Sequence, residues 1–304
     1  MVGSLKYPEK NKKTKLSSNI KFLVTEHSGL LEFLLSNLKK QSRNNVKSLL
    51  SHRQVLVDGK IITQYDYPLK NGQTIQILPS INRQAKQHDE LKILYEDPDL
   101  IVINKPAGLL SIASDREKER TAYHFATNYV RRSQPTNRIF IVHRLDRDTS
   151  GVLMFAKNQT MKQALQDQWD SLVSRRGYVA IVEGKLSKKS GRVQSWLKET
   201  KTMLMYSSNK PGDGLKAITN YEVIKENKDV SLVKIHLETG RKNQIRVHMK
   251  DLGHPVVGDK KYGAKTNPLK RLGLHAYKLE LTHPFSNQLL CFETAIPKSF
   301  TALF

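Results

Sequence analysis

The sequence has 304 residues, which is enough for one large domain and a smaller one with a sizeable apolar core. Its 51 Lys and Arg residues outnumber 28 Asp and Glu residues and give a formal net charge of +23. Such an excess of positive charge favours a polyanionic partner. We therefore expect nucleic acid, with an anionic membrane surface as the competing interpretation.

The single cysteine, Cys291, excludes an internal disulfide framework and a metal cluster built on cysteine. No apolar run approaches the length of a membrane span, and the opening residues MVGSLKYPEKNKK lack the apolar centre of a signal peptide. We therefore expect a soluble, cytoplasmic protein that does not enter the membrane, and we expect a monomer. Residues 1–20 carry five lysines and few apolar residues, which predicts a disordered basic tail.

Residues 21–80 have the pattern of a small separate module. Apolar residues three and four apart predict two short helices, the second of them capped by Ser42. An Asp58-Gly59 turn then predicts a hairpin, and a further strand follows it. This order resembles the small RNA-binding module named after ribosomal small-subunit protein S-four. The resemblance implies RNA contacts on the basic side of the module, and the alternative is a solvated basic helix. The candidate RNA-binding residues are Arg43, Lys47 and Arg53.

Residues 81–90 lack apolar periodicity, so we expect a linker there and a second domain from residue 91 to residue 304. This domain opens with two apolar segments joined by an Asp-Pro turn and followed by Lys105, which predicts a hairpin in which the lysine is structural. Residues 121–132 and 159–173 have the apolar spacing of helices.

The stretch from Arg138 to Lys157 concentrates polar side chains between two apolar runs. Each run is short enough for a buried strand, and residues 143–151 between them read HRLDRDTSG. A polar connection between two strands would hold these side chains on a rigid support. The alternative is a charged hairpin in which Asp148 or Ser150 bonds to the turn backbone.

Two later segments also place polar side chains beside predicted strands. An alternating segment predicts a strand with Tyr178 near its start. Another strand is predicted to end at Gly240, and the spacing after it predicts a helix from about Asn243 to Leu252 that is stopped by Gly253.

The loop HRLDRDTSG resembles the signature loop of the RluA-type pseudouridine synthases, which isomerise uridine in RNA. The segments around Lys105, Tyr178 and Arg246 resemble further blocks of that family, so the resemblance covers about residues 91–300. It implies an α+β fold with a mixed, largely antiparallel β-sheet flanked by helices. It also implies an isomerase that needs neither a cofactor nor a metal.

The resemblance assigns roles to individual residues in the two most specific blocks. It implies that Asp146 is the catalytic carboxylate and that Arg144 fills the space that the target base leaves. It further implies that Tyr178 stacks on the base. Arg246 is implied to pair with Asp146, because an adjacent cation favours the ionised form of a carboxyl group.

Arg241 and Gln244 are implied to position the site or the RNA. The family pattern around them is Leu-x-Thr-Gly-Arg-x-His-Gln-Ile-Arg-x-His, and this chain has Asn243 where the family usually has histidine. Asparagine keeps a donor and an acceptor but loses the charge of a protonated imidazole.

The implied substrate is a specific uridine in large-subunit ribosomal RNA, because the N-terminal module is of a ribosomal type, and transfer RNA is the alternative. Two other functions compete. Asp146 and Asp148 would lie about 7 Å apart in an extended segment, close to the spacing of an inverting glycosidase pair, which would release free uracil. The other is a non-catalytic RNA-binding or ribosome-assembly factor.

His275 and His283 lack the spacing of metal ligands, so we expect no metal site.

Overall fold

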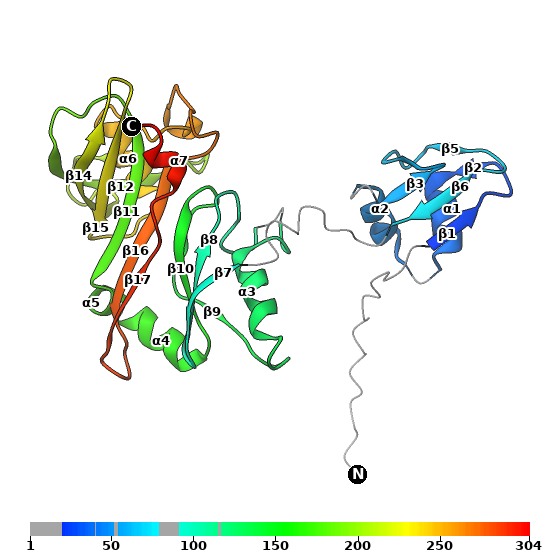
Figure 1. The fold of residues 1–304 in the computed structure, drawn as a ribbon, viewed down its shortest axis with the longest axis horizontal. Helices are drawn as coiled ribbons and strands as arrows, with labels where there is room; N and C mark the ends of the chain where they lie inside the picture. Colours follow the sequence, from blue (N-terminus) through cyan, green and yellow to red (C-terminus); the bar gives the residue numbers. More distant parts are fainter. Residues whose placement is uncertain (1–19, 40, 52–53, 79–90, 115–116) are drawn as a thin grey trace, which may run out of the picture. The chain divides into compact units, whose positions relative to one another are not determined.

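The computed structural model describes residues 20–39, 41–51, 54–78, 91–114 and 117–304. The chain divides into two compact units, Met1–His88 and Asp89–Phe304 (Figure 1). Of the expected tail only Ile20 is described, and the expected linker at 81–90 lies outside the described residues. Within the described ranges, every helix is too short or too polar to traverse a lipid bilayer.

The first unit packs two helices against a small antiparallel sheet. Its elements are β1 (Ile20–Leu23), β2 (Ser28–Gly29), α1 (Leu30–Asn37), α2 (Arg43–Ser51), β3 (Val55–Val57), β4 (Lys60–Ile61), β5 (Pro68–Leu69) and β6 (Thr74–Ile77). The main sheet has the order β1-β6-β3-β4, and β2 pairs with β5. Leu34 of α1, Val46 of α2 and Ile75 of β6 are fully buried in one core. The two helices and the hairpin predicted from the sequence are present.

Local chemistry explains the turns of this unit. Asp58 and Gly59 between β3 and β4 have φ values of 49° and 79°, and a tight two-residue hairpin turn needs positive φ at both positions. The Ser42 hydroxyl accepts the Asn45 N–H at 3.3 Å, which is the predicted cap of α2. On that helix Arg43 and Lys47 are exposed, whereas Arg53 lies outside the described residues.

The second unit is built around one 11-stranded sheet. Among the described residues, one pair of neighbouring strands in this sheet is parallel and the other pairs are antiparallel. Its strands are β7 (Lys92–Glu96), β8 (Leu100–Lys105), β9 (Phe140–Ile141), β10 (Ser150–Ala156), β11 (Arg175–Glu183), β12 (Ser190–Glu199), β13 (Met205–Ser208), β14 (Leu215–Glu226), β15 (Val230–Leu237), β16 (Leu274–Thr282) and β17 (Leu289–Glu293). Its helices are α3 (Ala122–Val130), α4 (Gln159–Asp167), α5 (Trp169–Leu172), α6 (Gln244–Asp251), the 3-10 helix η2 (Lys260–Tyr262) and α7 (Lys298–Thr301). The fold is therefore the predicted α+β class.

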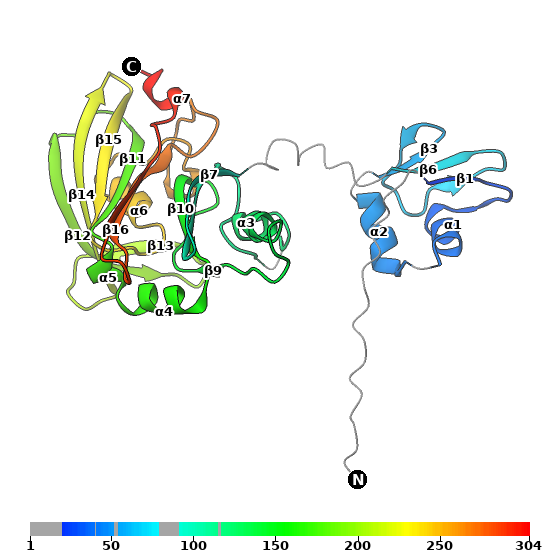
Figure 2. The same cartoon turned by 60° about the horizontal axis from the view of Figure 1, so that its bottom comes forward.

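Helices cover both faces of the half of the sheet formed by β7, β8 and β10 (Figure 2). Ala126 of α3 packs in a core with Phe155, whereas Met161 of α4 packs in another core with Met154. Neighbouring side chains on a strand point to opposite faces, so the whole of Ser150–Ala156 is buried. This burial on both sides explains the continuous apolar run in the sequence.

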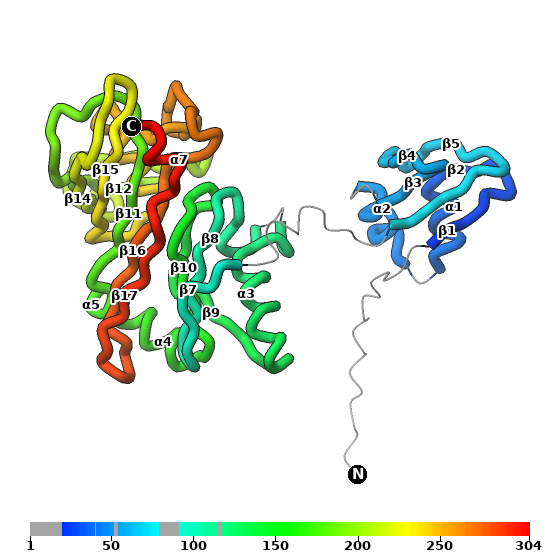
Figure 3. Tube along the Cα trace, viewed as in Figure 1, coloured from blue at the N-terminus to red at the C-terminus, as the bar shows by residue number. Residues whose placement is uncertain are grey.

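The two halves of the sheet meet where β10 runs parallel to β16, and Figure 3 traces both strands, orange for β16 and green for β10. The pairing is short, because only Ser150 and Gly151 are in register, with His275 and Ala276. Gly151 has φ 118°, and a Cβ atom on it would lie 2.0 Å from the Ala276 carbonyl oxygen. Only glycine allows this approach. The junction matters because Tyr178 of β11 pairs with the same Ala276 from the other side.

The expected single helix at 159–173 is wrong, because the chain breaks at Gln168. This residue has φ −122° and ψ 25°, so α4 ends before it and the short α5 begins after it. The Gln168 carbonyl accepts the Leu172 N–H at 2.9 Å and so starts the new turn. The change of direction brings the Trp169 ring to 5.3 Å from the His143 ring, a packing contact that local spacing does not encode.

Candidate active site

The polar loop between β9 and β10 is fixed by the segment that follows β8. The Ser111 hydroxyl donates to the Leu145 carbonyl at 2.7 Å, and the Leu145 N–H donates back to the same hydroxyl oxygen at 3.1 Å. Within the loop, the Thr149 N–H donates to the Asp146 carbonyl at 3.2 Å. The Asp146 side chain therefore projects from a turn that has its own backbone hydrogen bond and is also hydrogen-bonded to Ser111.

The fully buried Lys105 also bonds to the backbone of this loop and forms a clamp between the loop and the segment that follows β8. Its ammonium group donates to the carbonyl oxygens of Pro106, Leu109 and Arg147, at 3.0, 2.7 and 2.9 Å. Burial lowers the pKa of Lys105 to about 7, and the nearby Asp148 carboxylate opposes that change. Three acceptors need three donors, so the clamp requires the protonated amine.

We expect Lys105→Met to lower the free energy of unfolding by about 2 to 4 kcal/mol, because it leaves one buried and two part-buried carbonyl groups without their donor. Urea unfolding measures this loss. Lys157→Met is the matched control, because Lys157 bonds to the Glu96 carboxylate and the Asp97 carbonyl in the same half of the sheet. That part-exposed pair should contribute about 1 kcal/mol or less. Equal losses for the two variants would contradict the clamp.

A buried polar cluster fixes the loop before α6. The side-chain amide of Gln244 donates to the Ile218 carbonyl and to the Thr219 hydroxyl, both at 2.9 Å. Its oxygen accepts from the Thr239 hydroxyl at 2.8 Å and from the Arg241 N–H at 3.0 Å. Gln244 is thus bonded to β14 and to its own loop, which favours the positioning role among those expected for it.

His248 continues this cluster one turn further along α6. Its ring lies 2.9 Å from the Ser195 hydroxyl and 2.8 Å from the Thr219 hydroxyl. Burial lowers the pKa of His248 to about 4. The imidazole is therefore neutral in the folded protein at physiological pH, and the unfolded chain binds a proton that the folded one does not between pH 6.5 and about 4.

We expect the free energy of unfolding to fall as pH drops through that window, with His248 contributing up to about 1.4 kcal/mol per pH unit. Urea unfolding at several pH values measures the slope. His248→Gln lowers stability at neutral pH but removes this ionisation, so its slope should be smaller than that of the unchanged protein. Identical slopes would contradict a neutral buried His248.

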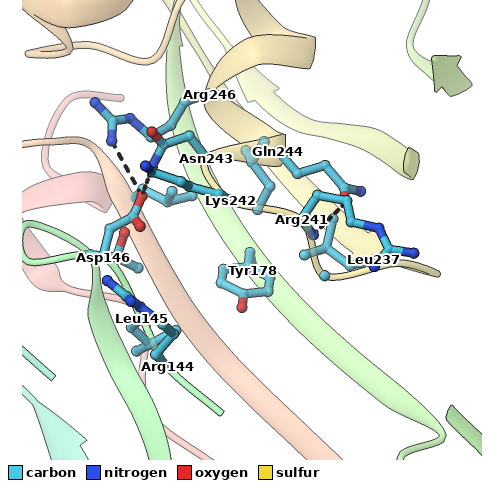
Figure 4. A pocket seen from close by; sticks show the side chains of 14 residues that line it. Arg144, Leu145, Asp146, Tyr178, Leu237, Arg241, Lys242, Asn243, Gln244 and Arg246 are labelled. Atoms are coloured by element: carbon cyan, nitrogen blue, oxygen red, sulfur yellow. Dashed lines mark hydrogen bonds and ion pairs between the residues drawn. The ribbon is translucent and has the colours of Figure 1, made fainter. Parts of the chain in front are cut away.

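The Asp146 carboxylate receives two donors from the start of α6. Its Oδ2 accepts the Asn243 side-chain N–H at 2.6 Å and an Arg246 N–H at 3.2 Å, which are the dashed lines at Asp146 in Figure 4. Arg246 is itself anchored to Asp259 by two further bonds, at 2.6 and 2.8 Å. The Asp259 side chain is only 1% exposed, whereas that of Asp146 is 29% exposed. Asp146 is therefore the carboxylate of this pair that faces the open site.

Burial alone lowers the pKa of Arg246, but the hydrogen bonds and charges of Asp259 and Asp146 outweigh it and raise the pKa. The guanidinium thus stays charged. It also lies against the Tyr262 ring, with its central carbon 4.7 Å from the ring centroid.

Asp146, Asn243 and Arg246 line a pocket of about 250 Å³ at the junction of β10, β16 and β11. Figure 4 shows Tyr178 between Asp146 on one side and Leu237 and Arg241 on the other. Burial raises the pKa of Tyr178 to about 12, so its phenol stays neutral. The pocket therefore offers a carboxylate and an uncharged aromatic ring to the same ligand.

Two arginines complete the rim of the pocket. Arg144 is exposed, and its side chain has no hydrogen-bond or ion-pair partner among the described residues. Arg241 is also exposed and donates to the Lys216 carbonyl at 3.0 Å. The structure thus brings together Asp146, Tyr178, Arg246, Arg144, Arg241 and Gln244. The predicted RNA contacts Arg43 and Lys47 belong to the other unit.

Sequence reasoning missed two members of this site, Asp259 and Tyr262. Both lie in a segment that reads as ordinary turns, and a buried carboxylate leaves no local signal there. The departure at Asn243 was visible, but not its contact with Asp146. Among the described residues, His, Cys, Asp and Glu form no group of three that could hold a metal ion. His275 instead bonds to Ser150 and Thr294.

Comparison with known families gives the same division of the chain. A model of the RNA pseudouridylate synthase family matches residues 99–251, and a model of the S4 domain matches residues 30–75. The first match contains Asp146, Tyr178 and Arg246. The chain belongs to the RluA-type RNA pseudouridine synthases. The predicted family and the predicted N-terminal module are thus confirmed.

Individual relatives cover most of this synthase. It is 34% identical over 279 residues to the uncharacterized RNA pseudouridine synthase YhcT of Bacillus subtilis. The aligned region covers 88% of this chain and 90% of the relative. It is 34% identical over 284 residues to ribosomal large subunit pseudouridine synthase D of Nitrosomonas europaea, with coverages of 88% and 80%. The solved structure of human RNA pseudouridylate synthase domain containing 1 is 26% identical, with a TM-score of 0.58, and covers 70% of this chain and 87% of that one. The synthase is an isomerase that acts on uridine in RNA.

Proposed function

We propose that this synthase converts specific uridines of large-subunit ribosomal RNA to pseudouridine, with Asp146 as the catalytic carboxylate. The name of the Nitrosomonas relative, a ribosomal large subunit synthase, supports this RNA over transfer RNA. The formal charge of +23 suits a long polyanionic substrate. The exposed Arg43 and Lys47 of the S4 unit are the proposed RNA contacts outside the site, as is Arg53.

The reaction exchanges one bond for another within the nucleoside. The bond from the anomeric carbon to N1 breaks, the base turns, and the same sugar carbon bonds to C5. A proton leaves C5 and N1 gains one, so no electrons are exchanged with another reactant. The protein has to supply an ionised carboxylate beside the sugar and a pocket that keeps the detached base.

The proposal rests on one observation, the convergence of Asp146 and Tyr178 in a single pocket of about 250 Å³. Asn243 and Arg246 hold the carboxylate in place before the RNA binds. A carboxylate that is already oriented needs no reorganisation during the reaction. The neutral Tyr178 ring is suited to stack on the uracil, which contributes about 1 to 3 kcal/mol for a base on an aromatic side chain.

The target uridine has to leave its stack to reach this pocket, which costs a few kcal/mol. Arg144 stands at the rim with no partner among the described residues, so its guanidinium is available to fill the vacated space. Stacking on Tyr178 and phosphate contacts by the basic surface offset the rest of the cost.

The geometry argues against a hydrolase that uses Asp146 and Asp148 as a pair. Asp148 is bonded to Arg147 through two contacts of 3.1 and 3.2 Å on the surface of the loop, and it does not line the pocket. A second carboxylate is therefore missing from the place where an inverting glycosidase needs one.

We expect Asp146→Asn to abolish pseudouridine formation while RNA affinity changes by less than about threefold, because the amide keeps the shape but loses the charge. Pseudouridines are mapped in ribosomal and transfer RNA from cells that lack the gene and are complemented with each variant. Asp148→Asn is the matched control from the same loop and should restore the modification. An active Asp146→Asn variant would contradict the catalytic assignment. A pseudouridine that the unchanged gene restores only in transfer RNA would contradict the ribosomal assignment.

We expect Arg144→Ala to slow the reaction on a structured RNA at least about tenfold more than on an unstructured oligomer of the same sequence, because only the structured substrate has a stack to refill. Single-turnover rates on the two RNAs give the ratio. Arg147→Ala, three residues along the same loop and paired with Asp148, is the control and should leave the ratio unchanged. Equal losses on both RNAs with Arg144→Ala would argue against the role of a wedge.

A further inference from the structure

Asn243 occupies an unusual place between the catalytic carboxylate and a buried tyrosine. Its backbone is left-handed, with φ 53° and ψ 20°, directly before α6. Its amide nitrogen donates to Asp146 at 2.6 Å, and its amide oxygen accepts from the Tyr262 hydroxyl at 3.0 Å. Both polar atoms of the side chain are therefore used in one line of hydrogen bonds that ends at the reacting group.

Tyr262 decides which way this amide points. The Tyr262 hydroxyl accepts the Met205 N–H at 3.2 Å, so its own proton is directed to the Asn243 oxygen. Burial raises the pKa of Tyr262, which keeps that proton in place. A reversed amide would set an NH₂ group against the hydroxyl proton and its oxygen against Asp146. The same tyrosine ring lies beneath Arg246, so Tyr262 contacts both groups that donate to the carboxylate.

We infer that Asn243 and Tyr262 are positioning residues for the isomerisation, with the Tyr262 hydroxyl orienting the Asn243 amide so that its N–H holds the Asp146 carboxylate against the sugar. This inference rests on the proposed role of Asp146. What the position requires is one donor beside one acceptor, and charge is not needed. A neutral imidazole also has one donor and one acceptor, so a histidine side chain meets the same requirement.

The left-handed backbone restricts which variants test this. Asn, Asp and His adopt that conformation more readily than other residues with a Cβ atom, so Asp and His can replace Asn243 with little strain. Asn243→Asp is nearly the same shape but turns the donor into an acceptor that faces Asp146. Asn243→His keeps a donor and an acceptor. Tyr262→Phe removes only the hydroxyl that orients the amide.

The experiment measures the single-turnover rate of pseudouridine formation by the full chain, on an RNA that the unchanged enzyme modifies. We expect Asn243→Asp to lose about 100-fold or more at neutral pH, the size of effect of removing one oriented donor. Tyr262→Phe should lose about tenfold, and Asn243→His should stay within about tenfold of the unchanged enzyme. RNA affinity should change by less than about threefold in all three variants.

A pH profile separates positioning from simple damage to the fold. The introduced carboxyl lies against Asp146 and the Tyr262 hydroxyl, and Arg246, which is paired with Asp259, donates to the same Asp146 oxygen. Two adjacent carboxylates share a proton more readily as pH falls, and the protonated one regains a donor. The rate of Asn243→Asp relative to the unchanged enzyme should therefore rise from about pH 8 to about pH 5.5.

Two results would overturn the inference. One is an Asn243→Asp variant that reacts at the unchanged rate. The other is a loss of rate in Asn243→Asp that does not vary with pH and that Asn243→His shows to the same extent. Failure of the proposed function looks different, because Asp146→Asn would then be active or the unchanged enzyme would form no pseudouridine. The two ideas therefore fail separately in one set of measurements.

Discussion

The close approach of β10 and β16 at Gly151 is the constraint on which the site depends. With a Cβ atom at this position 2.0 Å from the Ala276 carbonyl, any other residue would force the two halves of the sheet apart. The strand that starts there ends the loop of Asp146, and the strand beyond β16 carries Tyr178. Neighbouring strands lie about 4.8 Å apart, so the loop and the tyrosine are only two strand spacings from each other.

The charges of the site are arranged on this scaffold before any RNA binds. The buried Asp259 takes two bonds of the Arg246 guanidinium, which leaves another to Asp146. Lys105 bonds to the backbone of the Asp146 loop. A carboxylate whose donors and loop are already in place needs little reorganisation before it binds a ligand. The side chains that contact Asp146 are thus held by other parts of the fold, whereas Arg144 at the rim of the pocket is exposed.

Much of this was readable from local patterns. The helices of the S4 unit, the Asp58-Gly59 hairpin and the buried strand before Ala156 follow from apolar spacing and turn residues, which depend on neighbours in the chain. The break at Gln168 did not follow, and neither did the packing of Trp169 against His143, which lies 26 residues away along the chain. Asp259 and Tyr262 were missed for a related reason, since nothing next to them in the sequence indicates that they support an arginine and an amide.

By itself the sequence determined the family and the fold class, and it singled out Asp146 as the candidate carboxylate, because a nine-residue loop and the periodicity of its flanks are properties of contiguous residues. Only the tertiary structure decided what holds that aspartate. Asn243 and Arg246 are 97 and 100 residues away from it along the chain. They reach it because the register of β10, β16 and β11 and the packing of α6 bring distant segments to one point, and such contacts are set by the whole sheet rather than by any stretch of sequence.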